Sequence, residues 1–329
     1  MILGQDKAVA QFAHAWSGRK LHHAWLLAGP KGVGKATFAK VAARRVLSEA
    51  GGPAFDLPRL DTPDDHPVGK LVDAGSHPDM RWLERLADDK TDKVARNIKV
   101  DQVRALGEFM GMTAALSPWR VAVIDSVDDL EAAGANALLK MLEEPPPNSI
   151  FFLVSHSPGR LLPTIRSRCR RLDFQLLGND ALASILAEGS PALTAAELER
   201  VSALANGSAA RALDYAELGL AKIEDMALAI LRQGDPTNAR RSELASELGK
   251  KGAAERYAAF LTLAPSLVAR EARQAQGGVR ERALDAYGKV RELAAVAPRL
   301  SLDPAATVFQ IGGMLAAVPA KKPQPSLKR

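Results

Sequence analysis

A glycine-rich loop, Gly29–Ala36, lies directly between a short apolar run and a helical pattern. The apolar run, Ala24–Ala28, is typical of a strand buried on both faces of a parallel sheet. Glycines let backbone N–H groups curl around a phosphate, and the N-terminus of the following helix adds partial positive charge. This order predicts an α/β fold with a phosphate-binding loop whose cofactor-binding residues are Gly29, Gly32, Gly34 and Lys35.

The last position of this loop departs from the pattern that ATP hydrolysis needs. A Ser or Thr there contributes a hydroxyl to Mg²⁺, and this chain has Ala36. Thr37 is the next residue, but one step along a helix turns its side chain by about 100° away from the site. Two interpretations stay open: a loop that binds ATP without hydrolysing it, and a loop that is kept only for its shape.

A second apolar run, Val121–Ile124, ends in Asp125. In open α/β sheets this end of a strand is where ligands bind, and an acid there helps to hold Mg²⁺. The next position should carry a carboxylate that polarises the attacking water, and it carries Ser126. Asp128 and Asp129 lie too far along to replace it without a rearranged turn. We therefore interpret Asp125 as part of a degenerate nucleotide site.

The pattern continues with a helix over Asn136–Glu144, which Pro145–Pro147 must end. The strand Ile150–Val154 follows and ends at Ser155 and His156. These two polar residues are open to two interpretations, contact with a γ-phosphate or ordinary strand-end positions.

The cysteine and histidine residues limit the metal sites that the chain can form. Cys169 is the one cysteine in 329 residues, which excludes a disulfide framework and any multi-thiolate zinc site. His66 and His77 lie near several Asp residues, and there we favour a solvated loop over a metal site. No metal site is predicted.

Charge and hydropathy limit the partners. The chain has 44 Lys and Arg against 38 Asp and Glu, a net charge of +6, which permits contact with nucleic acid without establishing it. No apolar run reaches the roughly 18 residues of a membrane span, and no export signal is visible at the N-terminus. We expect a cytoplasmic protein with no membrane partner.

The remaining sequence suggests a division into domains. The segment Ala50–Pro78 is rich in Gly, Pro and Asp and predicts an irregular excursion. Short helical patterns follow the first domain, and beyond Leu218 an Ala-, Leu-, Arg- and Glu-rich pattern predicts an antiparallel helical bundle. The predicted boundaries are 1–175 for the α/β domain, 176–217 for a helical lid, 218–320 for a helical domain and 321–329 for a basic disordered tail.

Four arginines, Arg166, Arg168, Arg170 and Arg171, gather near the end of the first domain. Three interpretations stay open from the residues alone. The cluster is a solvated charged face, a nucleic-acid patch, or an arginine presented to the nucleotide of a neighbouring subunit, where it would stabilise charge in phosphoryl transfer.

Two phrases together resemble the clamp-loader branch of the AAA+ ATPases: Asn136–Pro146, which reads NALLKMLEEPP, and Ser167-Arg168-Cys169. The resemblance implies a AAA+ P-loop domain, a small helical lid and an all-α collar through which subunits assemble. It also implies that Arg168 is an arginine finger acting in trans on an adjacent subunit.

Two departures from the family pattern matter. Relatives often carry a four-cysteine zinc module in the segment that corresponds to Ala50–Pro78, and no cysteine is present there, so no zinc is expected. Active relatives place an arginine two residues after a Gly-Ser pair. In this chain Arg211 comes three residues after Gly207-Ser208, one position later than in those relatives. This second departure weakens the case for hydrolysis by the chain itself.

The resemblance implies a non-catalytic, stator-like subunit of a hetero-pentameric clamp loader. Its partners would be the other clamp-loader subunits, the sliding clamp and, through the complex, primed DNA. A different class stays open: an autonomous AAA+ motor acting on DNA, in which Thr37 and Asp128 compensate for the lost groups. A DNA-binding scaffold based on the basic excess is a third alternative.

Overall fold

A computed structural model describes residues 2–18, 21–86 and 94–319, which form two compact units. The first unit is Met1–Ala181 with Gly207–Ala210, and the second is Leu182–Asn206 with Arg211–Arg329. The predicted lid segment, 176–217, divides between the two units. The predicted tail, 321–329, lies outside the described residues.

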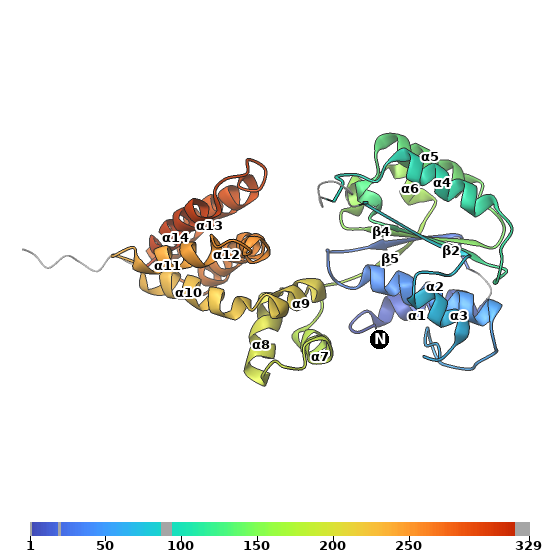
Figure 1. The fold of residues 1–329 in the computed structure, drawn as a ribbon, viewed down its shortest axis with the longest axis horizontal. Helices are drawn as coiled ribbons and strands as arrows, with labels where there is room; N and C mark the ends of the chain where they lie inside the picture. The colour runs from blue at the N-terminus through green and yellow to red at the C-terminus, as the bar shows by residue number, and fades with distance from the viewer. Residues whose placement is uncertain (1, 19–20, 87–93, 320–329) are drawn as a thin grey trace, which may run out of the picture. The chain divides into compact units, whose positions relative to one another are not determined.

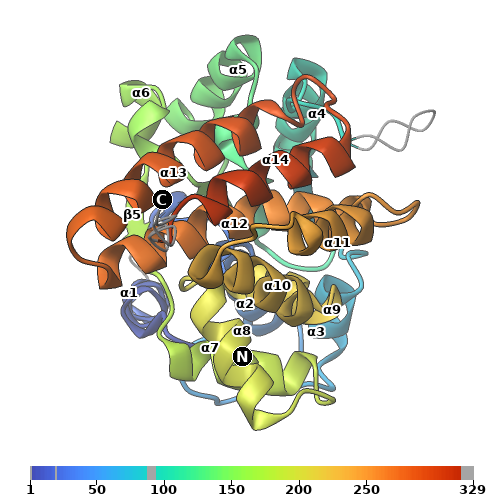
Figure 2. The same cartoon turned by 90° about the vertical axis from the view of Figure 1, so that its left-hand side faces the viewer.

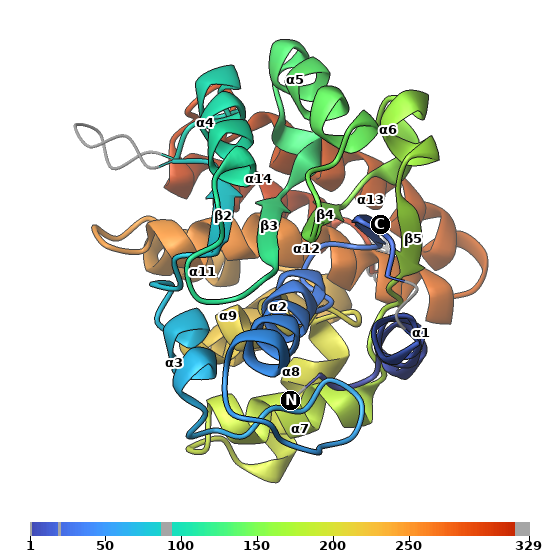
Figure 3. The same ribbon diagram turned by 90° about the vertical axis from the view of Figure 1, so that its right-hand side faces the viewer.

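A parallel five-stranded sheet forms the centre of the first unit (Figure 3). Its strands are β1 (Ala24–Ala28), β2 (Met80–Glu84), β3 (Arg120–Asp125), β4 (Ser149–Ser155) and β5 (Arg170–Asp173). They lie in the order β2-β3-β4-β1-β5, and all neighbours run parallel. Every residue of β1 and β4 is buried, which explains why both read as continuous apolar runs. The predicted α/β class is confirmed.

Helices cover both faces of this sheet (Figure 1). One face carries α1 (Asp6–Ser17), α2 (Lys35–Gly51) and α3 (Pro67–Asp73), and the other carries α4 (Val100–Gly111), α5 (Ala132–Glu143) and α6 (Pro163–Ser167). Single 3₁₀ turns lie at Val127–Asp129 and Pro158–Arg160. Because side chains alternate along a strand, Phe152 enters the core of the first face and Phe151 that of the second.

Two predicted extents were wrong. Helix α5 begins at Ala132, four residues before the predicted start, and its first turns include the buried Gly134. The segment Ala50–Pro78, predicted to be irregular throughout, contains α3. That helix has seven residues, too few for a clear helical period, and is fixed by Pro67 at its start.

The second unit is built of helices only, among the residues described. They are most of α7 (Asn179–Gly189), then α8 (Ala195–Leu204), most of α9 (Ala209–Glu217), α10 (Leu220–Gln233), α11 (Ala239–Leu248), α12 (Ala254–Gln274), α13 (Gly277–Val296) and α14 (Pro304–Ala316). Figure 2 shows α10 to α14 packed together. Phe260 and Leu263 on α12 and Ile311 on α14 are fully buried. The predicted all-α C-terminal region is confirmed.

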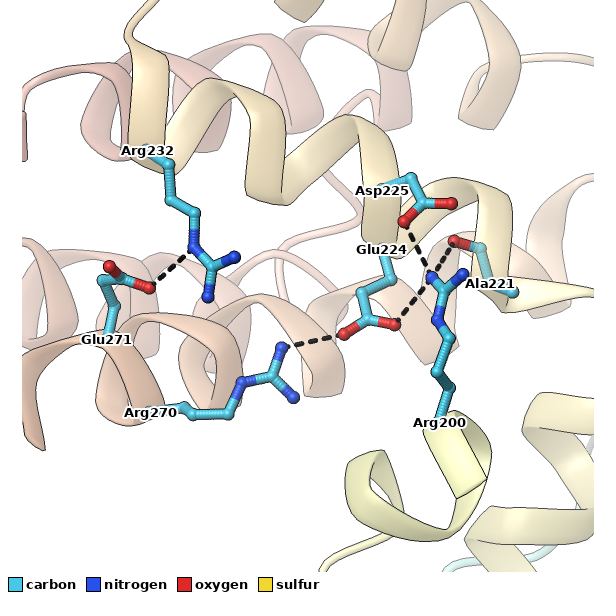
Figure 4. A network of polar contacts seen from close by, with 7 residues as sticks. All are labelled: Arg200, Ala221, Glu224, Asp225, Arg232, Arg270 and Glu271. Atoms are coloured by element: carbon cyan, nitrogen blue, oxygen red, sulfur yellow. Dashed lines mark hydrogen bonds and ion pairs between the residues drawn. The ribbon is translucent and has the colours of Figure 1, made fainter. Parts of the chain in front are cut away.

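A buried carboxylate, Glu224 on α10, lies at the centre of a polar network in the second unit (Figure 4). Arg200 on α8 and Arg270 on α12 both donate hydrogen bonds to it. Arg200 also pairs with Asp225 at 2.7 Å. Because a charge removed from water must be paired, Glu224 ties three helices of this unit to one another.

Across the described ranges, no helix has the length and apolar character that crossing a membrane requires.

Candidate functional site

The predicted phosphate-binding loop lies at the carboxyl end of β1 and leads into α2, which begins at Lys35. Two of its glycines, Gly32 and Gly34, have φ angles of 79° and 95°, in the left-handed region that favours glycine. The Gly29 amide donates to the Ser155 carbonyl at the end of β4 at 3.3 Å. The loop is therefore bound to the sheet edge where ligands of open α/β folds are held.

Lys35 is buried, and its ammonium group donates to carbonyls of its own loop. Its Nζ lies 2.6 Å from the Gly29 oxygen and also contacts the Pro30 oxygen. Burial lowers the pKa of Lys35 to about 8, and the carboxylates of Asp125 and Asp128 oppose that change. The structure thus brings Lys35 and Asp125 into one electrostatic environment, as the sequence predicts.

Asp125 ends β3, directly opposite Glu84 on the neighbouring strand β2. Burial raises the pKa of Asp125, the Glu84 carboxylate raises it further, and Lys35 opposes both. The backbone N–H groups of the glycine loop and the Lys35 ammonium are donors that fit a phosphate group, whereas the Asp125 carboxylate would need a cation between it and the phosphate. The site fits Mg²⁺ poorly, because Ala36 at the start of α2 offers no hydroxyl.

Asp128 is a central residue of this edge that the sequence did not reveal as such. Its carboxylate accepts hydrogen bonds from the Ser126 hydroxyl at 2.7 Å and the Ser155 hydroxyl at 2.9 Å. The backbone N–H groups of His156 and Ser157 donate to the same carboxylate.

These contacts decide what Asp128 can do. Burial alone would raise the pKa of Asp128, but the hydrogen bonds it accepts outweigh burial and lower it. Both of its oxygens are used to join the end of β3 to the end of β4. A carboxylate held in this way is a structural bridge, and it is poorly placed to polarise a water molecule. The Ser155 hydroxyl likewise serves Asp128, which favours the strand-end interpretation of that residue.

The segment after α8 lies against the glycine loop within the first unit. The Ala210 amide donates to the Gly32 carbonyl at 3.2 Å. A Cβ atom on Gly32 would come within 2.2 Å of the Ser208 hydroxyl oxygen and 3.0 Å of the Ala210 Cβ. Arg211, the arginine one position late, donates to the Ala205 carbonyl at 3.4 Å in the second unit.

Arg168 lies directly after α6, where its backbone caps the helix end. Its Nη1 donates to the Thr164 carbonyl at 2.9 Å, and its Nη2 is 2.7 Å from Oε1 of Glu143, the last residue of α5. The side chain is 33% exposed. Cys169 beside it packs against the apolar core, where burial raises the pKa of its thiol to about 12 and keeps it inert.

The two histidines considered for metal binding are both buried, so the preferred interpretation of a solvated loop was wrong. His66 Nδ1 accepts from the Gly69 amide at 3.3 Å and caps α3. His77 Nδ1 accepts from the Asp79 amide, and the Asp79 carboxylate accepts three amides of the loop before β3. Within the described part of the chain, no group of three or more His, Cys, Asp or Glu could hold a metal ion.

A parallel sheet in the order β2-β3-β4-β1-β5, with a P-loop after β1 and a helical C-terminal region, defines a AAA+ P-loop protein. The model of one family matches residues 4–178, more than half of the sequence. The chain belongs to that family, described as DNA polymerase III, delta subunit. The resemblance carried by Asn136–Pro146 and Ser167-Arg168-Cys169 is confirmed at this level.

Two curated relatives are subunits of DNA polymerase III. DNA polymerase III subunit delta' of Pseudomonas aeruginosa is 38% identical over 197 residues, 59% of this chain and 56% of that protein. Subunit gamma of Buchnera aphidicola is 31% identical over 220 residues, 66% of this chain and 56% of that protein. The chain thus spans about half the length of these curated relatives. A DNA polymerase III gamma subunit-related protein of Thermotoga maritima, 17% identical, aligns over 94% of this chain and 99% of its own with a TM-score of 0.47.

Proposed function

We propose that this protein is a non-catalytic, stator-like subunit of the cytoplasmic DNA polymerase III clamp loader. Its partners would be the delta and tau/gamma subunits of a hetero-pentamer that places the sliding clamp on primed DNA in replication. Membership of the delta-subunit family and the likeness to subunits delta' and gamma support this proposal.

The observation that carries the non-catalytic part is the use of Asp128. Hydrolysis by this chain would need replacements for the hydroxyl missing at Ala36 and the carboxylate missing at Ser126. Asp128 is the first acid after Ser126 in the chain, and its carboxylate accepts hydrogen bonds from the Ser126 and Ser155 hydroxyls instead. These hydrogen bonds argue against the alternative of an autonomous motor, in which Asp128 would have to compensate for a lost catalytic group.

Nucleotide binding without hydrolysis is compatible with the same residues. Gly29, Gly32, Gly34 and Lys35 would hold the phosphates of ATP, with Asp125 beside them. Lys35 would have to exchange the carbonyls of Gly29 and Pro30 for phosphate oxygens. We propose that this loop would bind ATP and would not hydrolyse it.

Arg168 is the residue through which the subunit would act on catalysis. Its guanidinium is partly exposed at the end of α6, so it can face a neighbouring subunit. An arginine supplied in trans stabilises the charge that develops on the transferred phosphoryl group. In this proposal a subunit that does not hydrolyse ATP itself completes the active site of a neighbour.

The experiment is a steady-state ATPase assay on the reconstituted complex with Arg168→Ala. The ATP site that receives this arginine should lose roughly 10³-fold or more in turnover. The ATPase rate of the whole complex should therefore fall by the fraction that this site contributes. Arg166→Ala is the matched control, because Arg166 is an exposed arginine two residues earlier. An unchanged rate in fully assembled Arg168→Ala complex would refute the finger.

The same assay on the isolated chain separates the alternative. An autonomous motor predicts turnover above background that disappears in Lys35→Ala, whereas the proposed subunit predicts no turnover alone. Salt-sensitive DNA binding by the isolated chain would instead favour a DNA-binding scaffold.

A further inference from the structure

We infer that Glu143 is the positioning residue for Arg168, an inference that rests on the proposed role of Arg168 in a neighbour's ATP site. Glu143 lies at the end of α5, and Arg168 lies just after α6, 25 residues later in the chain. Their side chains form an ion pair with Nη2 and Oε1 2.7 Å apart.

The guanidinium is held at two points on one side. Besides Glu143, its Nη1 donates to the Thr164 carbonyl one turn earlier in α6 at 2.9 Å. An arginine has five N–H donors, so these contacts leave the others free to meet an acceptor outside the subunit. The exposed third of the side chain gives that acceptor access.

The backbone on both sides of the pair is fixed by the core. Leu142 and Ile165, next to Glu143 and near Arg168, are almost completely buried. The three prolines after Glu144 prevent α5 from continuing, which keeps Glu143 at the helix end. The long side chain of Arg168 is then restricted by the Thr164 carbonyl and by the Glu143 carboxylate, and the carboxylate is the side chain among these two partners.

This arrangement suits positioning better than stabilisation. Glu143 is 48% exposed, and ion pairs in such places add little to folding. A long side chain must give up rotamer freedom when it reaches a phosphoryl group, however, and a side chain already held loses less. Glu143 would therefore raise the turnover of the neighbouring site without touching the nucleotide.

The test compares Glu143→Ala, Glu143→Gln and Arg168→Ala in the reconstituted complex with clamp and primed DNA. Glu143→Ala should lower kcat at the site served by Arg168 by about fivefold, the upper end of what one exposed pair contributes, with KM for ATP unchanged. Glu143→Gln should recover most of the rate, because its amide oxygen still accepts from Nη2. The double variant Glu143→Ala/Arg168→Ala should be no slower than Arg168→Ala alone.

Glu144→Ala is the matched control, because Glu144 is exposed at the same helix end and is in none of the ion pairs seen among the described residues. Complex mass measured by light scattering shows that each variant assembles. If Arg168→Ala slows turnover but Glu143→Ala does not, or speeds it, the positioning role is overturned and the finger stands. A further loss in the double variant also overturns it. If Arg168→Ala has no effect, the proposed function itself fails.

Discussion

Glu224 Oε1 accepts a hydrogen bond from Nη2 of Arg270 at 2.8 Å, and the carboxylate of this pair is far more buried than the guanidinium (Figure 4). Glu224 is 5% exposed, whereas Arg270 is 30% and its second partner, Arg200, 40% exposed. The two arginines can regain water when they lose Glu224, but Glu224 cannot when it loses them. The network is therefore energetically asymmetric.

The first prediction follows from this asymmetry. The double substitution Arg200→Ala/Arg270→Ala should lower the free energy of unfolding by about 3–5 kcal/mol, because it leaves a buried carboxylate unpaired. Glu224→Gln should cost no more than about 2 kcal/mol, since it leaves only partly exposed guanidinium groups. Urea denaturation at neutral pH measures both losses.

Glu271→Ala is the control for this comparison. Its carboxylate pairs with the half-exposed Arg232 at 3.0 Å, so its removal should cost less than about 1 kcal/mol. A larger loss in Glu224→Gln than in the double arginine variant would contradict the asymmetry.

The second prediction concerns acid stability. The hydrogen bonds to Asp128 lower its pKa below the ordinary 3.8, so folding favours the carboxylate. The stabilisation is complete above that ordinary value and is lost as the pH falls through the lower, folded-state pKa. Asp128→Asn should cost about 1.5–3 kcal/mol at pH 7 and should flatten the loss of stability in acid.

Urea midpoints measured from pH 7 down to the onset of acid unfolding test this. Asp101→Asn is the control, because Asp101 is exposed and pairs only with the exposed Arg104 among its described contacts. An Asp128→Asn variant whose stability declines as steeply in acid as that of the wild type would exclude the bridge as the cause.

The third prediction uses two glycines of the same loop. Both Gly32 and Gly34 have left-handed φ angles, but a Cβ on Gly34 meets no atom within 4 Å and one on Gly32 meets Ser208. Gly34→Ala should cost about 1–2 kcal/mol of backbone strain. Gly32→Ala should cost about 1–3 kcal/mol more and should speed hydrogen exchange of the Ala210 amide. Equal costs and unchanged exchange would mean that the Ser208 contact is not maintained in solution.

Sequence alone predicted the features that depend on local pattern. The glycine spacing of Gly29–Ala36 identifies its loop, because left-handed backbone and close approach demand glycine there. The continuous apolar residues of β1 and β4 indicate buried parallel strands for a similar reason. The end of α5 follows from its prolines.

What sequence missed depends on contacts between distant segments. Nothing near Asp128 in the chain signals that its acceptors will be filled by Ser155 and His156, which lie 27 and 28 residues away. Likewise Glu224 looks like any surface acid in a helical pattern until α8 and α12 place arginines beside it. The local sequence does not show that a charged residue is buried when the groups that pair with it lie on other helices or strands.

The last prediction concerns the excursion between α2 and α3, where Arg45 holds the irregular chain. Its Nη1 donates to the carbonyls of Leu57 at 3.0 Å and Asp61 at 2.6 Å, and its Nε pairs with Glu49. Arg45→Ala leaves these carbonyls without their donor and should cost about 2–3 kcal/mol.

Limited proteolysis should then cut the excursion faster in Arg45→Ala than in the wild type. Arg45→Lys should be intermediate, because an ammonium group lacks the planar guanidinium that serves the two carbonyls through Nη1 and Glu49 through Nε at once. Arg59→Ala is the control: its half-exposed side chain pairs with the exposed Asp6, and its loss should cost under about 1 kcal/mol. Equal protection of this segment in Arg45→Ala and wild type would show that other contacts hold it. Because the donors here are guanidinium N–H groups, a metal chelator should leave the cleavage rate of the wild type unchanged.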